Sequence, residues 1–144
     1  MQYHFDHSLG RITQQISRAL GKRFEQKCRN QGIRIRPDQW TVISLLFHKG
    51  SMPQNKIGDL LYIDKVAVSR TIERLEERNL VVQEVPGNDK RMRMVKLTSS
   101  GTEIYHQLSP LAGETITEAL EDLKEDETSQ LFESLEKIKI RLGC

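Results

Sequence analysis

The sequence predicts a mainly α-helical fold that carries one small β-hairpin. Apolar residues recur at three- and four-residue steps over most of the chain, which is the pattern of amphipathic helices. Two β-prone runs, residues 80–85 and 92–97, flank the turn-forming segment 86–91. With 144 residues, 37% of them hydrophobic and 29% charged, the chain suits a single domain with its own core. We therefore expect one domain over residues 1–144.

Two helices are predicted in the first third of the chain. An apolar stripe runs from Phe5 to Cys28 at helical spacing, and Gly32 ends it. Pro37 suits the first turn of a second helix, which is rich in apolar residues and ends before Gly50. This second helix is expected to lie in the core.

The segment 52–54 breaks the helical pattern, and two shorter helices follow it. Residues 57–61 predict the first, and Asp64 is a suitable N-cap for the second, which ends at Asn79. The few residues between them match the spacing of a helix-turn-helix. At about 100° per residue, one face of the second helix points away from the apolar side chains. That exposed face carries Val66, Ser69, Arg70, Glu73 and Arg74.

Two further helices are predicted after the hairpin. Thr98 caps a long helix in which Pro110 predicts a kink near Ser109, and an acidic turn at residues 124–127 precedes the last helix. Residues 1–36 carry a net charge of +6 and residues 101–144 a net charge of −6, although the whole chain has only +2. Because opposite charges attract, we expect the two ends of the chain to pack together.

A Ser- and Arg-bearing helix followed by a basic hairpin is the order of a winged helix-turn-helix, in which the helix enters the major groove and the hairpin lies on the phosphates. Arginine can bind guanine through two hydrogen bonds, and an apolar side chain can contact the thymine methyl group. In an isolated helix, Arg70 and Arg74 would more simply be solvated partners of nearby glutamates, but the basic hairpin favours DNA contact. The expected DNA-binding residues are Lys65, Val66, Ser69, Arg70, Arg74, Asp89, Lys90, Arg91 and Arg93.

Five segments carry a family resemblance: R-P-D-Q-W at 36–40, Q-N-K-I-G-D-L-L at 54–61, D-K-V-A-V-S-R-T-I-E-R-L-E-E-R-N-L-V at 64–81, N-D-K-R at 88–91 and V-K-L-T-S-S-G at 95–101. Together they resemble the MarR family of bacterial transcriptional regulators over most of the chain. The most specific element is D-x-R in the hairpin, followed by L-T-x-x-G. One departure is Lys124, which stands where a Ser or Thr often caps the last helix.

The resemblance implies a winged helix-turn-helix homodimer. It implies that residues 1–36 and 101–144 supply the dimerisation helices, that residues 37–100 form the DNA-binding winged helix, and that a small ligand releases the DNA. In this family the hairpin arginine, here Arg91, approaches the minor groove or its phosphates, and the aspartate, here Asp89, steadies the hairpin. We expect a repressor on a double-stranded, pseudo-palindromic operator, with major grooves about 34 Å apart; an activator remains open.

Two other functions remain open. One is a winged-helix protein-interaction module without DNA binding, which the basic hairpin disfavours. The other is a redox-responsive regulator that uses Cys28, which has Lys27 and Arg29 beside it but lies on the apolar stripe, where a thiol is inert. An effector pocket would be lined by Trp40, Phe24 and Tyr105, which are equally suited to a core.

Several classes of protein are disfavoured. The chain lacks the nucleophile-elbow, zinc-protease and phosphate-loop motifs, so we do not expect an enzyme. His4 and His7 have no evident third ligand, and Cys28 and Cys144 form no zinc motif, so neither a metal nor another cofactor is expected. No apolar run approaches the roughly 20 residues that span a bilayer, and no signal peptide is evident, which predicts a cytoplasmic protein outside membranes.

Overall fold

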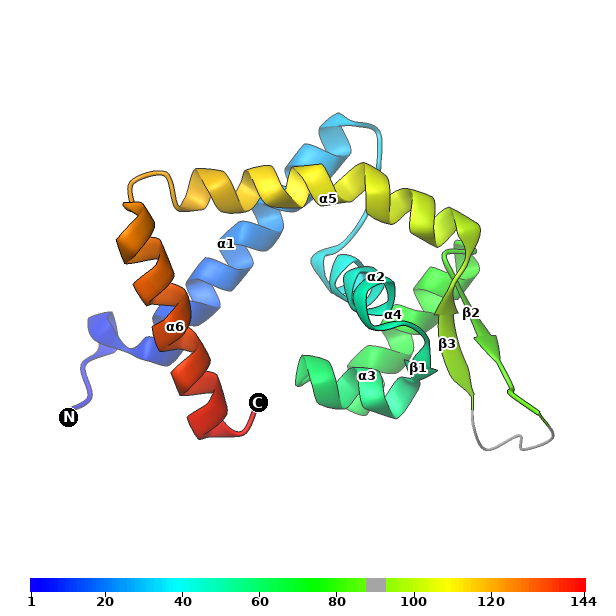
Figure 1. Cartoon of the computed structure of the whole chain (residues 1–144), viewed down its shortest axis with the longest axis horizontal. Coiled ribbons are helices and arrows are strands. Elements are labelled where there is room, and N and C mark those ends of the chain that lie inside the picture. Colours follow the sequence, from blue (N-terminus) through cyan, green and yellow to red (C-terminus); the bar gives the residue numbers. More distant parts are fainter. Residues whose placement is uncertain (88–92) are drawn as a thin grey trace.

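The computed structural model describes residues 1–87 and 93–144. It confirms the predicted fold class, because helices dominate and the strands form one small antiparallel sheet (Figure 1). The elements, in chain order, are the 3-10 turn η1 (Phe5–His7), α1 (Leu9–Asn30), α2 (Pro37–Lys49), β1 (Met52–Pro53), α3 (Gln54–Leu61), α4 (Lys65–Glu77), β2 (Val81–Glu84), β3 (Met94–Leu97), α5 (Ser99–Ala119) and α6 (Glu125–Leu142).

The core lies mainly between α2, α3, α4 and the sheet, which together form the winged-helix lobe. Its most deeply buried side chains include Ile43, Ile57, Ile72, Leu75 and Val95, which are completely buried. They come from three helices and one strand, and burying each large apolar side chain contributes about 1.5–3 kcal/mol. This core fixes α4 against its neighbours.

The two helices of the helix-turn-helix are closed as the sequence predicts. Tyr62 takes a left-handed conformation with φ 54° and ends α3. The Asp64 side chain then accepts a hydrogen bond from the Ala67 N–H at 2.9 Å, which confirms the predicted N-cap of α4. After α4, Asn79 has φ 55°, a conformation that asparagine tolerates better than most residues.

The sheet has the strand order β1-β3-β2. Strands β2 and β3 lie within the two β-prone runs and pair with Val81 opposite Leu97, while the predicted strand residue Met92 lies outside the described residues. The sequence predicted only a chain break at residues 52–54, yet Met52 pairs with Val95 in strand β1. A strand of two residues shows no alternating pattern, so periodicity could not reveal it.

The terminal helices pack as their charges predict. Figure 1 shows α5 spanning the molecule from the sheet to α6, with α1 crossing it. The Lys27 ammonium lies 2.6 Å from Glu118 and 3.4 Å from Glu114, and Arg23 lies 3.7 Å from Glu118, so basic α1 pairs with acidic α5. The hydrogen bond between Lys27 and Glu118 raises the pKa of Lys27 and lowers the pKa of Glu118.

The starts of α1 and α6 differ from simple expectation. Although the apolar stripe begins at Phe5, α1 starts only at Leu9, because Ser8 caps it and accepts a hydrogen bond from the Arg11 N–H. The Lys124 side chain has no oxygen that could cap the helix, but the Glu127 carboxylate accepts a hydrogen bond from the backbone N–H of Lys124 at 2.9 Å. This reciprocal half of a capping box, with the acidic first turn, accounts for a helix start without Ser or Thr.

An aromatic cluster joins the winged-helix lobe to the terminal helices. Phe24 of α1 lies 5.3 Å from Trp40 of α2, measured between ring centroids, and Trp40 stacks on Tyr105 of α5 at 5.5 Å. Tyr105 also stacks on Phe47 at 3.7 Å, and its hydroxyl lies 2.9 Å from His48 Nε2. Phe24, Trp40 and Tyr105, for which the sequence predicted a core or an effector pocket, thus pack against one another beside the core of the lobe.

Candidate DNA-binding surface

Helix α4 divides into a buried and an exposed face, as the helical phase predicts. Val68, Ile72 and Leu75 are buried in the lobe. On the opposite side, Val66 is 61% exposed. Lys65, Arg70 and Arg74 are also exposed, and Ser69 is half-buried at the edge. The predicted side chains of α4 therefore share one accessible face.

Ser69 lies in a hollow between α4 and the hairpin. Its hydroxyl donates a hydrogen bond to Glu73 at 3.2 Å. The hollow, of about 460 Å³, is lined by Pro53, Gln54, Asn55, Ser69, Glu73, Gln83 and Arg93. Thus two predicted site residues far apart in sequence, Ser69 and Arg93, meet at one depression.

Gln54 and Asn55 also line this hollow, although neither is among the DNA-binding residues predicted from the sequence. They begin α3, where backbone N–H groups lack helical partners and the positive end of the helix dipole favours an anion. Two polar side chains at the start of the first helix of a helix-turn-helix were the signal available in the sequence. Both can donate amide hydrogen bonds to phosphate oxygens.

Helix α4 is anchored to the start of α2 by a partly buried polar contact. The Thr71 hydroxyl donates to Asp38 Oδ2 at 2.7 Å, and Arg36 Nε donates to Asp38 Oδ1 at 3.1 Å. Burial alone would raise the pKa of Asp38, but the hydrogen bonds from Thr71 and Arg36 outweigh it, so the pKa is lowered. The Asp38 carboxylate thus helps to set the position of α4.

The base of the hairpin is fixed by the L-T-x-x-G motif. Thr98 Oγ1 accepts a hydrogen bond from the Gly101 N–H at 3.0 Å and donates to the carbonyl of Asn79 at 2.6 Å. A Cβ at Gly101 would collide with the carbonyl of Leu80, so only glycine fits there. Arg93 and Lys96 are exposed, whereas Asp89, Lys90 and Arg91 lie outside the described residues.

The cysteines and histidines bear on the redox and metal hypotheses. Cys28 is completely buried, and this burial raises the pKa of its thiol to about 11, whereas Cys144 is exposed. Within the described ranges, no group of three or more His, Cys, Asp or Glu side chains is placed to hold a metal ion. Across the same part of the chain, no helix has the length and apolar character required to cross a membrane.

Comparisons with known proteins agree with this geometry. The sequence model of the MarR family matches residues 35–92. YwoH, an HTH-type transcriptional regulator of Bacillus subtilis (strain 168), is 32% identical over 135 residues, which are 94% of this chain and 95% of YwoH. The crystal structure of a MarR/EmrR family transcriptional regulator from Acinetobacter sp. ADP1 is 30% identical and superposes with a TM-score of 0.86 over 98% of this chain and 99% of that one.

A further solved structure includes nucleic acid. A MarR mutant from E. coli complexed with operator DNA is 25% identical and has a TM-score of 0.80 over 90% of this chain and 92% of that one. These relatives are transcriptional regulators, not enzymes. With a 32% identical relative covered almost end to end, this chain belongs to the MarR family of DNA-binding transcriptional regulators.

Proposed function

We propose that the protein is a homodimeric repressor that binds a pseudo-palindromic operator and is released from it by a small ligand. The observation that carries the DNA part of this proposal is the exposed face of α4 beside the hollow that joins Ser69 to Arg93. In this arrangement one helix enters the major groove while the adjoining hairpin contacts the backbone. The E. coli relative solved in complex with operator DNA supports operator binding by this chain.

Each side chain on α4 has a role that its chemistry suits. Arg70 donates two hydrogen bonds to guanine, Val66 contacts a thymine methyl group, and Ser69 binds a base or a phosphate. Lys65 lies at the start of the helix, where its ammonium neutralises a phosphate, and Arg74 lies one turn after Arg70. Sequence is thus selected mainly by the N-terminal half of α4.

The hairpin supplies the backbone contacts. Lys90, Arg91 and Arg93 add positive charge that displaces condensed counterions from DNA. Asp89 is an anion that phosphates would repel, so we assign it to bracing Arg91 rather than to DNA. Gln54 and Asn55 contribute further phosphate contacts from the start of α3.

The surface area of the chain supports a dimer formed by residues 1–36 and 101–144, with residues 37–100 as the DNA-binding unit. The single chain exposes 10779 Å², whereas a monomeric protein of its mass typically exposes about 7,600 Å². None of the residues of α6, all of which the structure describes, is buried. Leu131, Phe132 and Ile140 remain exposed along α6, and a second copy would cover them.

The experiment compares Arg70→Ala with Arg91→Ala on two DNA fragments, the DNA upstream of the protein's own gene and a random sequence. Arg70→Ala should cost about 1–3 kcal/mol on the operator and little on random DNA. Arg91→Ala should weaken binding to both DNAs by similar factors and reduce the salt slope by about one unit.

Lys22→Ala, which removes an exposed cation from α1, is the charge-matched control and should bind both DNAs as the wild type does. Equal losses on both DNAs for Arg70→Ala would reject base recognition by α4. Absence of binding to any DNA by the wild type would favour a protein-interaction module instead.

A further inference from the structure

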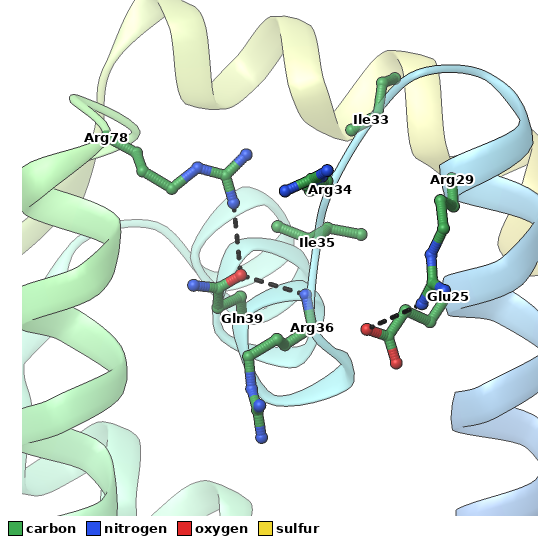
Figure 2. Close-up of a pocket in the computed structure, with 8 residues that line it drawn as sticks. All are labelled: Glu25, Arg29, Ile33, Arg34, Ile35, Arg36, Gln39 and Arg78. Atoms are coloured by element: carbon green, nitrogen blue, oxygen red, sulfur yellow. Dashed lines mark hydrogen bonds and ion pairs between the residues drawn. The ribbon is translucent and has the colours of Figure 1, made fainter.

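A second cavity, of about 540 Å³, lies between the end of α1, the connection at residues 31–36, the start of α2 and the end of α4. Its walls carry four arginines, Arg29, Arg34, Arg36 and Arg78, and a single carboxylate, Glu25. Figure 2 shows Arg78 reaching in from α4, Arg34 on the connection and Arg29 on α1. The cavity is therefore a concentrated positive site between the end of α1 and the end of α4.

Two of these arginines already have acidic partners. Arg29 lies 3.6 Å from Glu25, and Arg36 lies 3.1 Å from Asp38. Over residues 1–87 and 93–144, no carboxylate lies within ion-pair distance of Arg34 or Arg78. Arg78 instead donates to the Gln39 amide oxygen at 3.3 Å. Two guanidinium charges thus face the same cavity without an anion to neutralise them.

We propose that this cavity binds a small organic dianion, and that its binding weakens the protein's hold on DNA. A guanidinium group donates two parallel hydrogen bonds to the two oxygens of a carboxylate or phosphate, whereas the lysine ammonium does not. Two unpaired cations fit two negative charges, as on a dicarboxylate or a phosphoryl group. The volume falls in the range of about 300–1,000 Å³ that is usual for small-molecule sites.

The site lies beyond the part of α4 that is assigned to base contacts, although Arg74, which is also assigned to DNA, is only one turn before Arg78. Arg78 follows the last residue of α4, whereas Lys65 and Val66 begin that helix. At 1.5 Å per residue, the two ends are about 20 Å apart, so a helix whose N-terminal half enters the groove holds Arg78 away from the bases. The cluster is therefore assigned to a free small molecule, and a DNA-backbone contact becomes an outcome of the test.

The same residues connect the cavity to the position of α4. Gln39 is buried, and its amide oxygen accepts hydrogen bonds from the backbone N–H of Arg36 at 3.0 Å and from the guanidinium of Arg78 at 3.3 Å. Arg36 also holds Asp38, which accepts the hydroxyl of Thr71 on the buried face of α4. A dianion that draws the two guanidinium groups into the cavity takes Arg36 from Asp38 and Arg78 from Gln39. The attachment of α4 to α2 is thereby loosened.

Binding is tested without DNA, by calorimetric titration of the full-length protein with succinate and with inorganic phosphate at constant ionic strength. Binding to the wild type and to Lys22→Gln is expected, with affinity about tenfold lower in Arg34→Gln and in Arg78→Gln, since each loses charge-assisted hydrogen bonds. Both arginines are exposed, so their variants should fold. No heat with either probe, or equal affinities in all four proteins, would overturn the site. Tighter binding of succinate identifies a carboxylate ligand, and tighter binding of phosphate a phosphoryl ligand.

The coupling is tested by operator binding with and without the tighter probe, and this arm rests on the proposed function. The probe should lower the operator affinity of the wild type, and Arg34→Gln should need about ten times more probe for the same effect. An unchanged wild-type affinity would refute the coupling. Weaker operator binding by Arg34→Gln without any probe would reassign the arginines to the DNA backbone and reject the dianion site. Failure of the wild type to bind DNA would defeat the proposed function, while the titration would still decide the dianion site.

Discussion

The winged-helix lobe and the helix α6 differ sharply in how much of their apolar surface a single chain buries. In the lobe, Ile43, Ile57, Ile72 and Leu75 are completely buried by neighbours from the same chain. In α6, which the structure describes in full, no residue is buried although apolar side chains recur along it. The lobe therefore has the core of an independent unit, whereas the terminal helices have an apolar surface that suits a second chain.

The two regions are nevertheless connected. Trp40 of the lobe lies between Phe24 of α1 and Tyr105 of α5, and Lys27 pairs with Glu118 across the two helices. Because α5 continues from the sheet through to α6, a dimer built on the terminal helices would fix the separation of the two lobes. That separation decides whether the α4 helices of both copies reach adjacent major grooves.

The largest effect is expected from breaking the proposed dimer. The double substitution Leu131→Ser with Phe132→Ser removes two exposed apolar side chains, and a two-fold dimer contains each of them twice. At about 1.5–3 kcal/mol for each buried side chain, the dimer dissociation constant should rise by about three orders of magnitude or more. Sedimentation velocity measures the change.

Glu133→Gln is the control on the same helix, because it alters an exposed carboxylate and should leave the dimer intact. An unchanged sedimentation coefficient for the double variant at low protein concentration would contradict a dimer interface that includes α6. The lobe should stay folded in the double variant, since its core lies elsewhere.

The next effect concerns the core of the lobe. Ile72→Ala removes a completely buried side chain of α4 and should lower the free energy of unfolding by about 2–5 kcal/mol. Urea denaturation followed by circular dichroism measures it. Val82→Ala shortens a 39% exposed side chain of β2 and should cost less than about 1 kcal/mol. Similar losses for the two variants would show that α4 is not held by this core.

The same comparison explains how much the sequence could predict. The lobe follows local signals: helical periodicity, the Asp64 cap, the left-handed Asn79 and the Thr98–Gly101 contact are each written within a few residues. The two-residue strand β1 has no such signal. The hollow shared by Ser69 and Arg93, and the cavity that brings Arg34 to Arg78, depend on how distant segments cross, which spacing along the chain does not encode.

A smaller effect is expected from the contact that attaches α4 to α2. Thr71→Val removes the hydroxyl that donates to Asp38 and should cost about 1–3 kcal/mol at neutral pH. The pKa of Asp38 is lowered below its ordinary value of 3.8, so its stabilising contribution is present above that value and is lost as the pH falls through the lowered pKa. Urea denaturation should therefore show a difference between wild type and variant at pH 7 that shrinks below about pH 4. A difference that stays constant or grows in acid would reject this role for Asp38.

The smallest effect is expected at Cys28, which lies on α1, where the terminal helices meet the aromatic cluster. Its thiol is completely buried and has a pKa of about 11, so at pH 8 only about one molecule in a thousand carries the reactive thiolate. A thiol reagent should label Cys144 rapidly and Cys28 only after unfolding in urea, and labelling stoichiometry measures both. Cys28→Ser should bind operator with little change, because the thiol makes no part of the proposed DNA surface. Peroxide that releases the wild type from operator but not Cys28→Ser would show the opposite, that this helix opens and exposes the thiol to oxidation. The switch would then lie in the terminal helices and not in the arginine-lined cavity, where we propose it.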